Sequence, residues 1–188
     1  AHTLQMLHNE TQTLSRLIDD LFTIARIEEA QLVLHLRTLD VRSVVQHAVD
    51  GIRDVAWDQR RVTVQSVIQP GLPAIRADET RVRQILGNLL YNALRHTPEG
   101  GIVVIDATLL PDVIEISVAD TGVGIPAAEL ERVFERFHQV EREGRHADNS
   151  GLGLAIVRQL VEVMGGSISA ESTTGVGSVF RVRLPRVG

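Results

Sequence analysis

Residues 78–96 read DETRVRQILGNLLYNALRH, and their pattern carries the fold prediction. Asp78 is a typical helix N-cap, and Thr97-Pro98-Glu99-Gly100-Gly101 ends the run, because proline and glycine do not continue a helix. Apolar residues recur at helical spacing between these signals. They share one face: Val82, Ile85, Leu86, Leu89, Leu90, Ala93 and Leu94. The stretch therefore predicts a helix with one side in a core.

The opposite face of this helix is expected to be polar and carries Arg81, Gln84, Asn88, Asn92 and Arg95. A solvated face is the simple alternative. Solvated faces favour Glu and Lys, however, because asparagine is a poor helix former. Two asparagines one turn apart therefore indicate a ligand, and an amide oxygen suits Mg²⁺.

Sequence on both sides of this helix predicts an α/β domain. Asp40 can cap a helix over residues 41–55, and residues 152–164 form another helix that closes at Gly165-Gly166. Strands are predicted at residues 32–37, 62–67, 74–77, 102–108, 114–119, 167–171 and 178–184. The predicted fold class is a two-layer α/β sandwich, with helices on one face of a mixed sheet.

The first 31 residues predict one long helix with an apolar stripe. The stripe is Leu4, Leu7, Leu14, Ile18, Leu21 and Ala25, widened by Leu17, Phe22, Ile24 and Ile27. Either the rest of this chain or a bundle with a second chain must cover it, and the bundle is favoured because the stripe is long. The predicted domains are residues 1–31 and 32–188.

Residues 126–150 lie between the predicted strand 114–119 and the predicted helix 152–164. They contain one short helical stretch, followed by a polar run from Glu141 to Asn149 without apolar periodicity. A loop of this length inside a compact domain is usually functional or mobile. We predict that it is a lid.

Composition excludes several classes of function. The 188 residues include no cysteine, which rules out a thiolate zinc site and a cysteine nucleophile. A net charge of −5, without a basic run, argues against a nucleic-acid partner. No apolar run approaches the roughly 20 residues that cross a bilayer. The histidines lack paired ligand spacing, so we expect surface or packing roles for His8, His35, His47, His138 and His146.

Two glycine clusters complete the set of candidate site residues. Asp120 follows the parity of Ile114, Ile116 and Val118, so its carboxylate should lie near the buried side and needs a donor. It opens Asp120-Thr121-Gly122-Val123-Gly124-Ile125, which taken alone could be a plain turn.

The second cluster, Ser150-Gly151-Leu152-Gly153-Leu154, starts a helix, where free N–H groups favour an anion, although close packing is the alternative. There is no Gly-x-x-x-x-Gly-Lys loop, which excludes a Walker-type site.

In this order, the clusters resemble the N, G1 and G2 boxes of the ATP-binding catalytic domain of two-component sensor histidine kinases, in the superfamily of gyrase, Hsp90 and MutL. Residues 84–93 with Thr97-Pro98 resemble the N box, and Phe134-Glu135-Arg136-Phe137 resembles the F box. The resemblance covers about residues 32–185 and implies a Bergerat-type ATP-binding fold. The first helix resembles the second helix of the family's dimerisation and histidine-phosphotransfer domain.

The resemblance implies ATP and Mg²⁺ as cofactors and gives each site residue a role. Asn92 would bind Mg²⁺, Asn88 and Arg95 would assist at the phosphates, and His96 would lie beside the nucleotide. Asp120 would accept from the adenine amino group. The base pocket would include Gly122, Gly124, Ile125 and Ser178, and the phosphates would lie at Gly151, Leu152, Gly153 and Leu154. Two positions depart from the usual pattern: Asn149 replaces a glycine, and Arg95 replaces the more frequent lysine.

The implied function is transfer of the ATP γ-phosphate to a histidine on the dimerisation domain of a homodimeric kinase, for relay to a response regulator in the cytoplasm. Membrane contact by this chain is not expected, although a membrane-anchored parent is compatible with it. The family's acceptor segment, of His-Glu-x-x-Thr/Asn-Pro type, is absent, so autophosphorylation of the chain alone is not expected.

The alternative function is a nucleotide-dependent interaction module without phosphotransfer. A gyrase-like ATPase is disfavoured, because Asn88 stands where those relatives carry a glutamate that activates water.

Overall fold

The computed structural model describes residues 18–29, 31–140 and 150–187. A five-stranded sheet has the order β2-β4-β5-β7-β6. β2 pairs parallel with β4, and the other neighbours pair antiparallel. The strands are β2 (Thr63–Ile68), β4 (Ile102–Leu109), β5 (Val113–Asp120), β6 (Ser167–Thr173) and β7 (Gly177–Pro185). The predicted mixed sheet is therefore confirmed.

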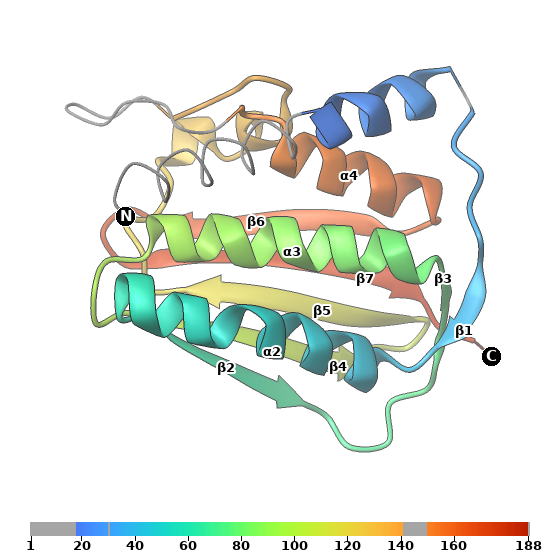
Figure 1. Ribbon diagram of the computed structural model, residues 1–188, viewed down its shortest axis with the longest axis horizontal. Helices are drawn as coiled ribbons and strands as arrows, with labels where there is room; N and C mark the ends of the chain where they lie inside the picture. Colours follow the sequence, from blue (N-terminus) through green and yellow to red (C-terminus); the bar gives the residue numbers. More distant parts are fainter. Residues whose placement is uncertain (1–17, 30, 141–149, 188) are drawn as a thin grey trace, which may run out of the picture.

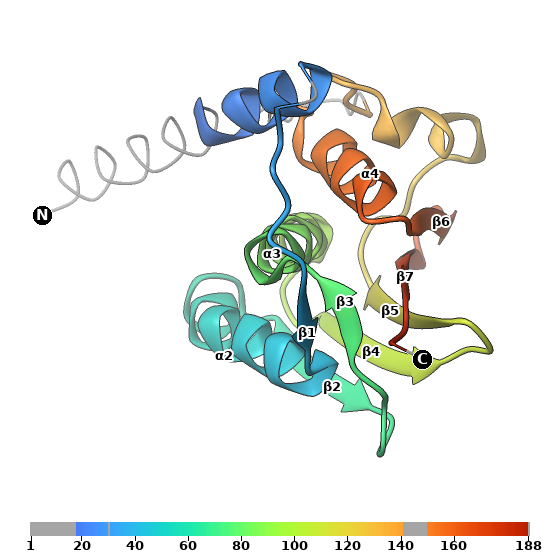
Figure 2. The same cartoon turned by 90° about the vertical axis from the view of Figure 1, so that its right-hand side faces the viewer.

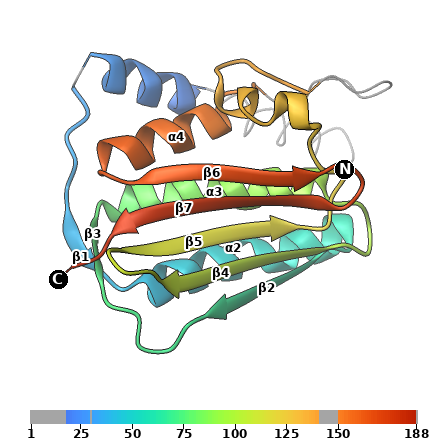
Figure 3. The same ribbon diagram turned by 180° about the vertical axis from the view of Figure 1, so that it is seen from behind.

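Three helices cover one face of this sheet and leave the other face open (Figures 1 and 3). They are α2 (Val41–Arg60), α3 (Glu79–His96) and α4 (Gly153–Val163). The predicted helix caps are present, since the Asp40 side chain accepts from the Arg42 N–H and the Asp78 side chain accepts from Thr80 and Arg81. The α2 helix continues beyond the predicted end at Val55. The two-layer sandwich is confirmed.

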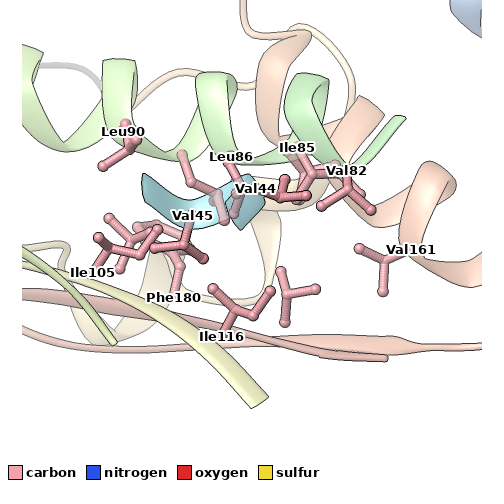
Figure 4. Packing of buried hydrophobic residues seen from close by; sticks show 14 of the residues in the cluster. Val44, Val45, Val82, Ile85, Leu86, Leu90, Ile105, Ile116, Val161 and Phe180 are labelled. Atoms are coloured by element: carbon pink, nitrogen blue, oxygen red, sulfur yellow. The ribbon is translucent and has the colours of Figure 1, made fainter. Parts of the chain in front are cut away.

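The core lies between α3 and the sheet. All seven residues of the predicted apolar face of α3 are buried. On β5, Ile114, Ile116, Val118 and Asp120 are buried and alternate with half-buried residues, as the predicted parity requires. Figure 4 shows side chains of the two layers in contact range, among them Ile85, Leu86, Leu90, Ile105, Ile116 and Phe180. Burying each such side chain contributes about 1.5–3 kcal/mol.

The polar row of α3 is not a solvated face. Arg81, Gln84, Asn88, Asn92 and Arg95 are half-buried, whereas the exposed ridge of the helix contains Arg83, Gly87 and Tyr91. The helix packs between α2 and α4, which cover its two flanks (Figure 1). The helical projection placed this row opposite the core but could not give its burial, because a projection does not include neighbouring helices.

The predicted strand at residues 32–37 is wrong except at its last residue. The chain is extended over residues 32–36 without a ladder, and the strand is β1 (Arg37–Leu39), which pairs antiparallel with β3 (Ile75–Ala77) in a separate two-stranded sheet. Leu32 and Leu34 are half-buried against the core and Val33 and His35 are exposed. The alternation of half-buried and exposed residues at 32–35 therefore reflects contact with the core. A strand also needs a neighbouring strand with which to pair.

Residues 18–28 are helical and lie beside α4 (Figure 2). Ile24 is buried in the core, and the Gln84 Nε2 donates to the Thr23 Oγ1 at 3.4 Å. In contrast, Ile18, Leu21 and Phe22 are each more than half exposed. Among the described residues, the domain thus covers one side of the stripe and leaves the other side exposed. The remainder of the predicted helix, Leu4 to Leu17, lies outside the described residues.

The first part of the predicted lid contains two short 3-10 helices instead of one helical stretch. These are η1 (Ala127–Glu129) and η2 (Arg132–Phe134). Phe134 packs edge-on against Phe180 of β7, with ring centroids 6.2 Å apart. Arg136 forms an ion pair with Glu28. Residues 141–149, which include Asn149, lie outside the described residues, so the lid remains a prediction.

None of the helices in the described ranges combines the length and the apolar character needed to cross a bilayer.

Candidate functional site

The C-terminal half of α3 brings the three motifs together. The Asn88 Nδ2 donates to the Gly153 carbonyl of α4 at 3.2 Å, and the Val123 N–H donates to the His96 carbonyl at 3.2 Å. Asn92 lies one turn beyond Asn88 on the same half-buried flank. The helix is therefore a shared wall, with the loop after β5 at its end and the start of α4 beside it (Figure 1).

Asp120 is the buried ionisable group of this site. It ends β5 beside Ser178 of β7, and only 8% of its surface is exposed. Its carboxylate accepts from the Gly122 N–H at 2.8 Å and from both the N–H and the hydroxyl of Ser178. Burial raises the pKa of Asp120 above its ordinary value, and the three hydrogen bonds offset only part of that effect.

These hydrogen bonds leave room for a ligand. An ionised carboxylate has about four acceptor positions, so the donors of Gly122 and Ser178 leave the Asp120 carboxylate able to accept from a ligand. A buried carboxylate needs hydrogen-bond donors, and for Asp120 the protein itself supplies the first of them. A further donor from a ligand would complete the set and would lower the cost of the desolvated charge.

The glycines after Asp120 approach protein backbone. A Cβ on Gly122 would lie 2.5 Å from the His96 carbonyl oxygen, and one on Gly124 would lie 2.1 Å from the Thr173 carbonyl oxygen. Gly124 also has a φ of 67°. Both glycines therefore let the loop pack against α3 and the β6–β7 hairpin, which forms the shape of the site. Ile125 packs partly buried against the core.

The second glycine cluster begins α4. Gly151 has a φ of 68°, and its carbonyl accepts from the Phe137 N–H at 3.0 Å. The Leu152 side chain is buried in the core and Leu154 packs partly against it, so these two residues can offer a ligand mainly their backbone. Among the described side chains none caps the first turn of α4. That turn can therefore receive an anion.

Arg95 and His96 also lie at this end of α3. They line a hollow of about 480 Å³ together with residues 58, 60, 61, 97–99 and 123. Asn92, Asp120 and Gly153 do not line it. A second hollow, of about 420 Å³, lies at the other end of α3, around Arg26, His35 and Asp78. The geometry thus places Arg95 and His96 at the margin of the candidate site.

Sequence reasoning missed Ser172. Its Oγ accepts from the Ile125 N–H at 2.7 Å and lies 3.0 Å from the Ser178 Oγ. Ser172 and Ser178 are register partners in the β6–β7 hairpin. The pairing would have revealed this contact, but the predicted strand ended one residue earlier, at Glu171.

A metal at this site would depend on few protein ligands. Within residues 18–29, 31–140 and 150–187, no group of three or more His, Asp or Glu side chains could hold a metal ion. The magnesium prediction therefore depends on one amide oxygen, that of Asn92. A single amide oxygen fits Mg²⁺, which keeps several waters and takes its other ligands from phosphates.

Comparison with known proteins agrees with this geometry. Residues 77–188 match the model of the family described as histidine kinase-, DNA gyrase B- and HSP90-like ATPases, and the chain belongs to that family. Within it, the domain is of the sensor histidine kinase type, as its relatives show.

The sensor protein IrlS of Burkholderia pseudomallei is 38% identical over 179 residues, which are 94% of this chain and 38% of that protein. The histidine protein kinase DivJ of Caulobacter vibrioides is 37% identical over 185 residues, with 98% of this chain and 31% of that protein covered. Full-length ShkA in complex with AMPPNP superposes with a TM-score of 0.84 at 31% identity, over 97% of this chain and 38% of that one. The chain thus spans about a third of the length of these relatives.

Proposed function

We propose that this chain binds Mg·ATP and, in the intact protein, transfers the γ-phosphate to a histidine on a dimerisation domain. One observation carries the proposal: the buried Asp120 carboxylate can still accept from a ligand, at the same end of α3 where the asparagines and the start of α4 meet. A purine amino group supplies a further donor, and the α4 turn suits the phosphates. Membership of the ATPase family supports the same reading.

The proposed roles follow from position. Asp120 accepts from the adenine amino group, with Gly122, Gly124, Ile125 and Ser178 shaping the base pocket. Asn88 and Arg95 assist at the phosphates, and His96 lies beside the nucleotide. The backbone of residues 151–154 donates to the phosphates. Residues 126–150 act as a lid over the bound nucleotide.

In this proposal the Asn92 amide oxygen would hold Mg²⁺ together with the phosphates, and the ion would supply positive charge near the γ-phosphoryl group. The Asn88 amide is already engaged, because its Nδ2 donates to Gly153. An amide is also no general base, which disfavours water activation. The chain's own contribution is then mainly positioning and electrostatic stabilisation.

The proposed partners are the dimerisation domain of the same kinase and a response regulator that receives the phosphate on an aspartate. Residues 1–31 are proposed to be the second helix of that domain, and residues 32–188 the catalytic domain. The exposed Ile18, Leu21 and Phe22 support this division, because they leave apolar surface for a helical bundle. The kinase would act in the cytoplasm, where ATP is available.

Phosphotransfer is tested by mixing this chain with γ-labelled ATP and a separate dimerisation domain that carries the acceptor histidine. We expect acid-labile, base-stable label on the added domain and none on the chain alone. A matched reaction uses that domain with its histidine replaced by alanine. Measurable ATP binding without any label on the histidine-bearing domain would contradict phosphotransfer. Rapid phosphate release by the chain alone would instead favour hydrolysis.

Binding should weaken in acid, because Asp120 accepts only when ionised. Burial raises its pKa, so protonation begins above the pH at which an ordinary Asp titrates. We therefore expect ATP affinity to fall as the pH is lowered from about 7 to about 4, through the raised pKa of Asp120. The contribution of Asp120 to the free energy of unfolding should instead rise as the pH falls, because the folded state binds the Asp120 proton more tightly than the unfolded state does.

The measurement is a set of ATP titrations over this pH range, with Asp120→Asn as control. The variant has no carboxyl at this position and should lack the part of the acid effect that belongs to Asp120. An identical pH profile in the variant would remove Asp120 from the explanation.

A further inference from the structure

The hydroxyl of Ser172 lies at the centre of a hydrogen-bond network behind Asp120. It is half-buried on β6 and accepts from the Ile125 N–H at 2.7 Å. It also lies 2.7 Å from the Gly177 carbonyl oxygen and 3.0 Å from the Ser178 Oγ. Ser172 thus ties the end of the loop after β5 to the residue that contacts Asp120.

The network has a direction. Each hydroxyl carries one proton. The Ser178 hydroxyl donates to the Asp120 carboxylate, so toward Ser172 its oxygen can only accept. The single Ser172 proton is shared between the Gly177 carbonyl oxygen and the Ser178 Oγ, and the Ser172 oxygen accepts from the Ile125 N–H. Asp120 is therefore the final acceptor of a chain that runs Ile125, Ser172, Ser178, Asp120.

We propose that Ser172 is a positioning residue that, through Ser178, fixes the Asp120 carboxylate as an acceptor and so selects a purine with an amino group over one with an oxo group. This inference rests on the proposed nucleotide binding at Asp120. Because Ser172 holds Ser178, the lone pair of the Asp120 carboxylate that remains for a ligand points in one fixed direction. An oxo group there would face a carboxylate without a donor, and a site built to receive a donor rejects such an analogue.

Without the Ser172 hydroxyl, the Ser178 hydroxyl loses its donor and can rotate away from Asp120. The carboxylate would then keep only its two backbone donors, from Gly122 and Ser178, and the Ile125 N–H would lose its acceptor. Both changes act on the base pocket and leave the α4 turn intact. The effect should therefore appear in the choice of base more than in the binding of phosphates.

The test compares ATP with inosine triphosphate, which has the same phosphates and an oxo group in place of the amino group. Dissociation constants are measured for the unmodified chain and for Ser172→Ala, Ser172→Thr and Ser167→Ala. Ser167 is exposed on the same strand and is the matched control. We expect the preference for ATP to fall about tenfold in Ser172→Ala, to return in Ser172→Thr, and to stay unchanged in Ser167→Ala.

The outcomes separate this inference from the proposed function. If the unmodified chain binds ATP and prefers it, but Ser172→Ala keeps the same preference, Ser172 is merely structural and the inference is overturned. Equal losses of affinity for both nucleotides lead to the same conclusion. If the unmodified chain does not bind ATP, the proposed function fails and the inference with it. Thermal unfolding without nucleotide identifies a misfolded Ser172→Ala, in which case Ser172→Cys, a weak donor of similar size, should show the reduced preference.

Discussion

Asp120→Asn should lower the affinity for ATP by about one to two orders of magnitude, because a hydrogen bond to a charged group contributes about 1.5–3 kcal/mol. The carboxylate accepts from Gly122 and Ser178 and can still accept from a ligand donor. An asparagine side chain at this position has only one acceptor oxygen. Its amino end would face either a protein N–H or the adenine amino group, and neither can accept from it. Isothermal titration with ATP measures the loss.

Asp106→Asn is the matched control for this substitution. Asp106 lies on β4 of the same sheet, and its pKa is also raised, by burial and then by the nearby Glu115. It pairs in register with Ser117, away from the candidate site. We expect ATP affinity within about twofold of the unmodified chain, a difference below about 0.5 kcal/mol, as for a site that does not contact the ligand. Equal losses in the two variants would contradict the assignment of Asp120.

Gly177→Ala should destabilise the domain by about 2–4 kcal/mol and remove most ATP binding, because overpacking and an unfavourable φ act together. A Cβ at this position would lie 1.9 Å from the Asp120 carbonyl oxygen, and the residue has a φ of 141°. The clash is with backbone, so no side-chain rotation can relieve it. The chain around Asp120 and Thr121 must move, and the carboxylate moves with it.

Gly175→Ala measures the effect of an unfavourable φ on stability without a steric clash. Gly175 lies in the same hairpin with a φ of 80°, and a Cβ there would meet nothing within 4 Å. We expect a loss of about 1–2 kcal/mol in the free energy of unfolding, with ATP affinity preserved. Urea unfolding and ATP titrations of both variants make the comparison. Similar behaviour of the two variants would show that close contact with Asp120 is unimportant.

The helices and most strands could be predicted because their signals are local. The apolar spacing of α3 and the Asp78 cap identified a helix whose seven predicted core residues are all buried. The parity of β5 placed Asp120 on the buried side of the strand. Residues 32–36 show the limit of this reasoning, because alternation marks the sides that face a core, whereas a strand also requires a partner.

The sequence predicted which residues form the site, but it predicted only some of the contacts between them. The order of Asn88, Asp120 and the glycines indicated a common site, and α3 does bring the three motifs together. Only the structure shows that Gly122 and Gly124 make room for protein backbone, and Gly124 also has a positive φ. Ser172 was not predicted at all, since a serine near a strand end carries no signal of its own.

The sequence by itself determined where helices begin, which residues face a core and which family's motifs are present, because these properties depend on neighbours a few positions apart. Only the tertiary structure decided which groups satisfy Asp120, how far the asparagine row is buried and which glycines lie close to other backbone. Those properties depend on contacts between β5, α3 and the β6–β7 hairpin, which are distant in the chain. Hydrogen bonds and close packing act over only a few ångströms in space, so their partners emerge when the sheet and helices assemble.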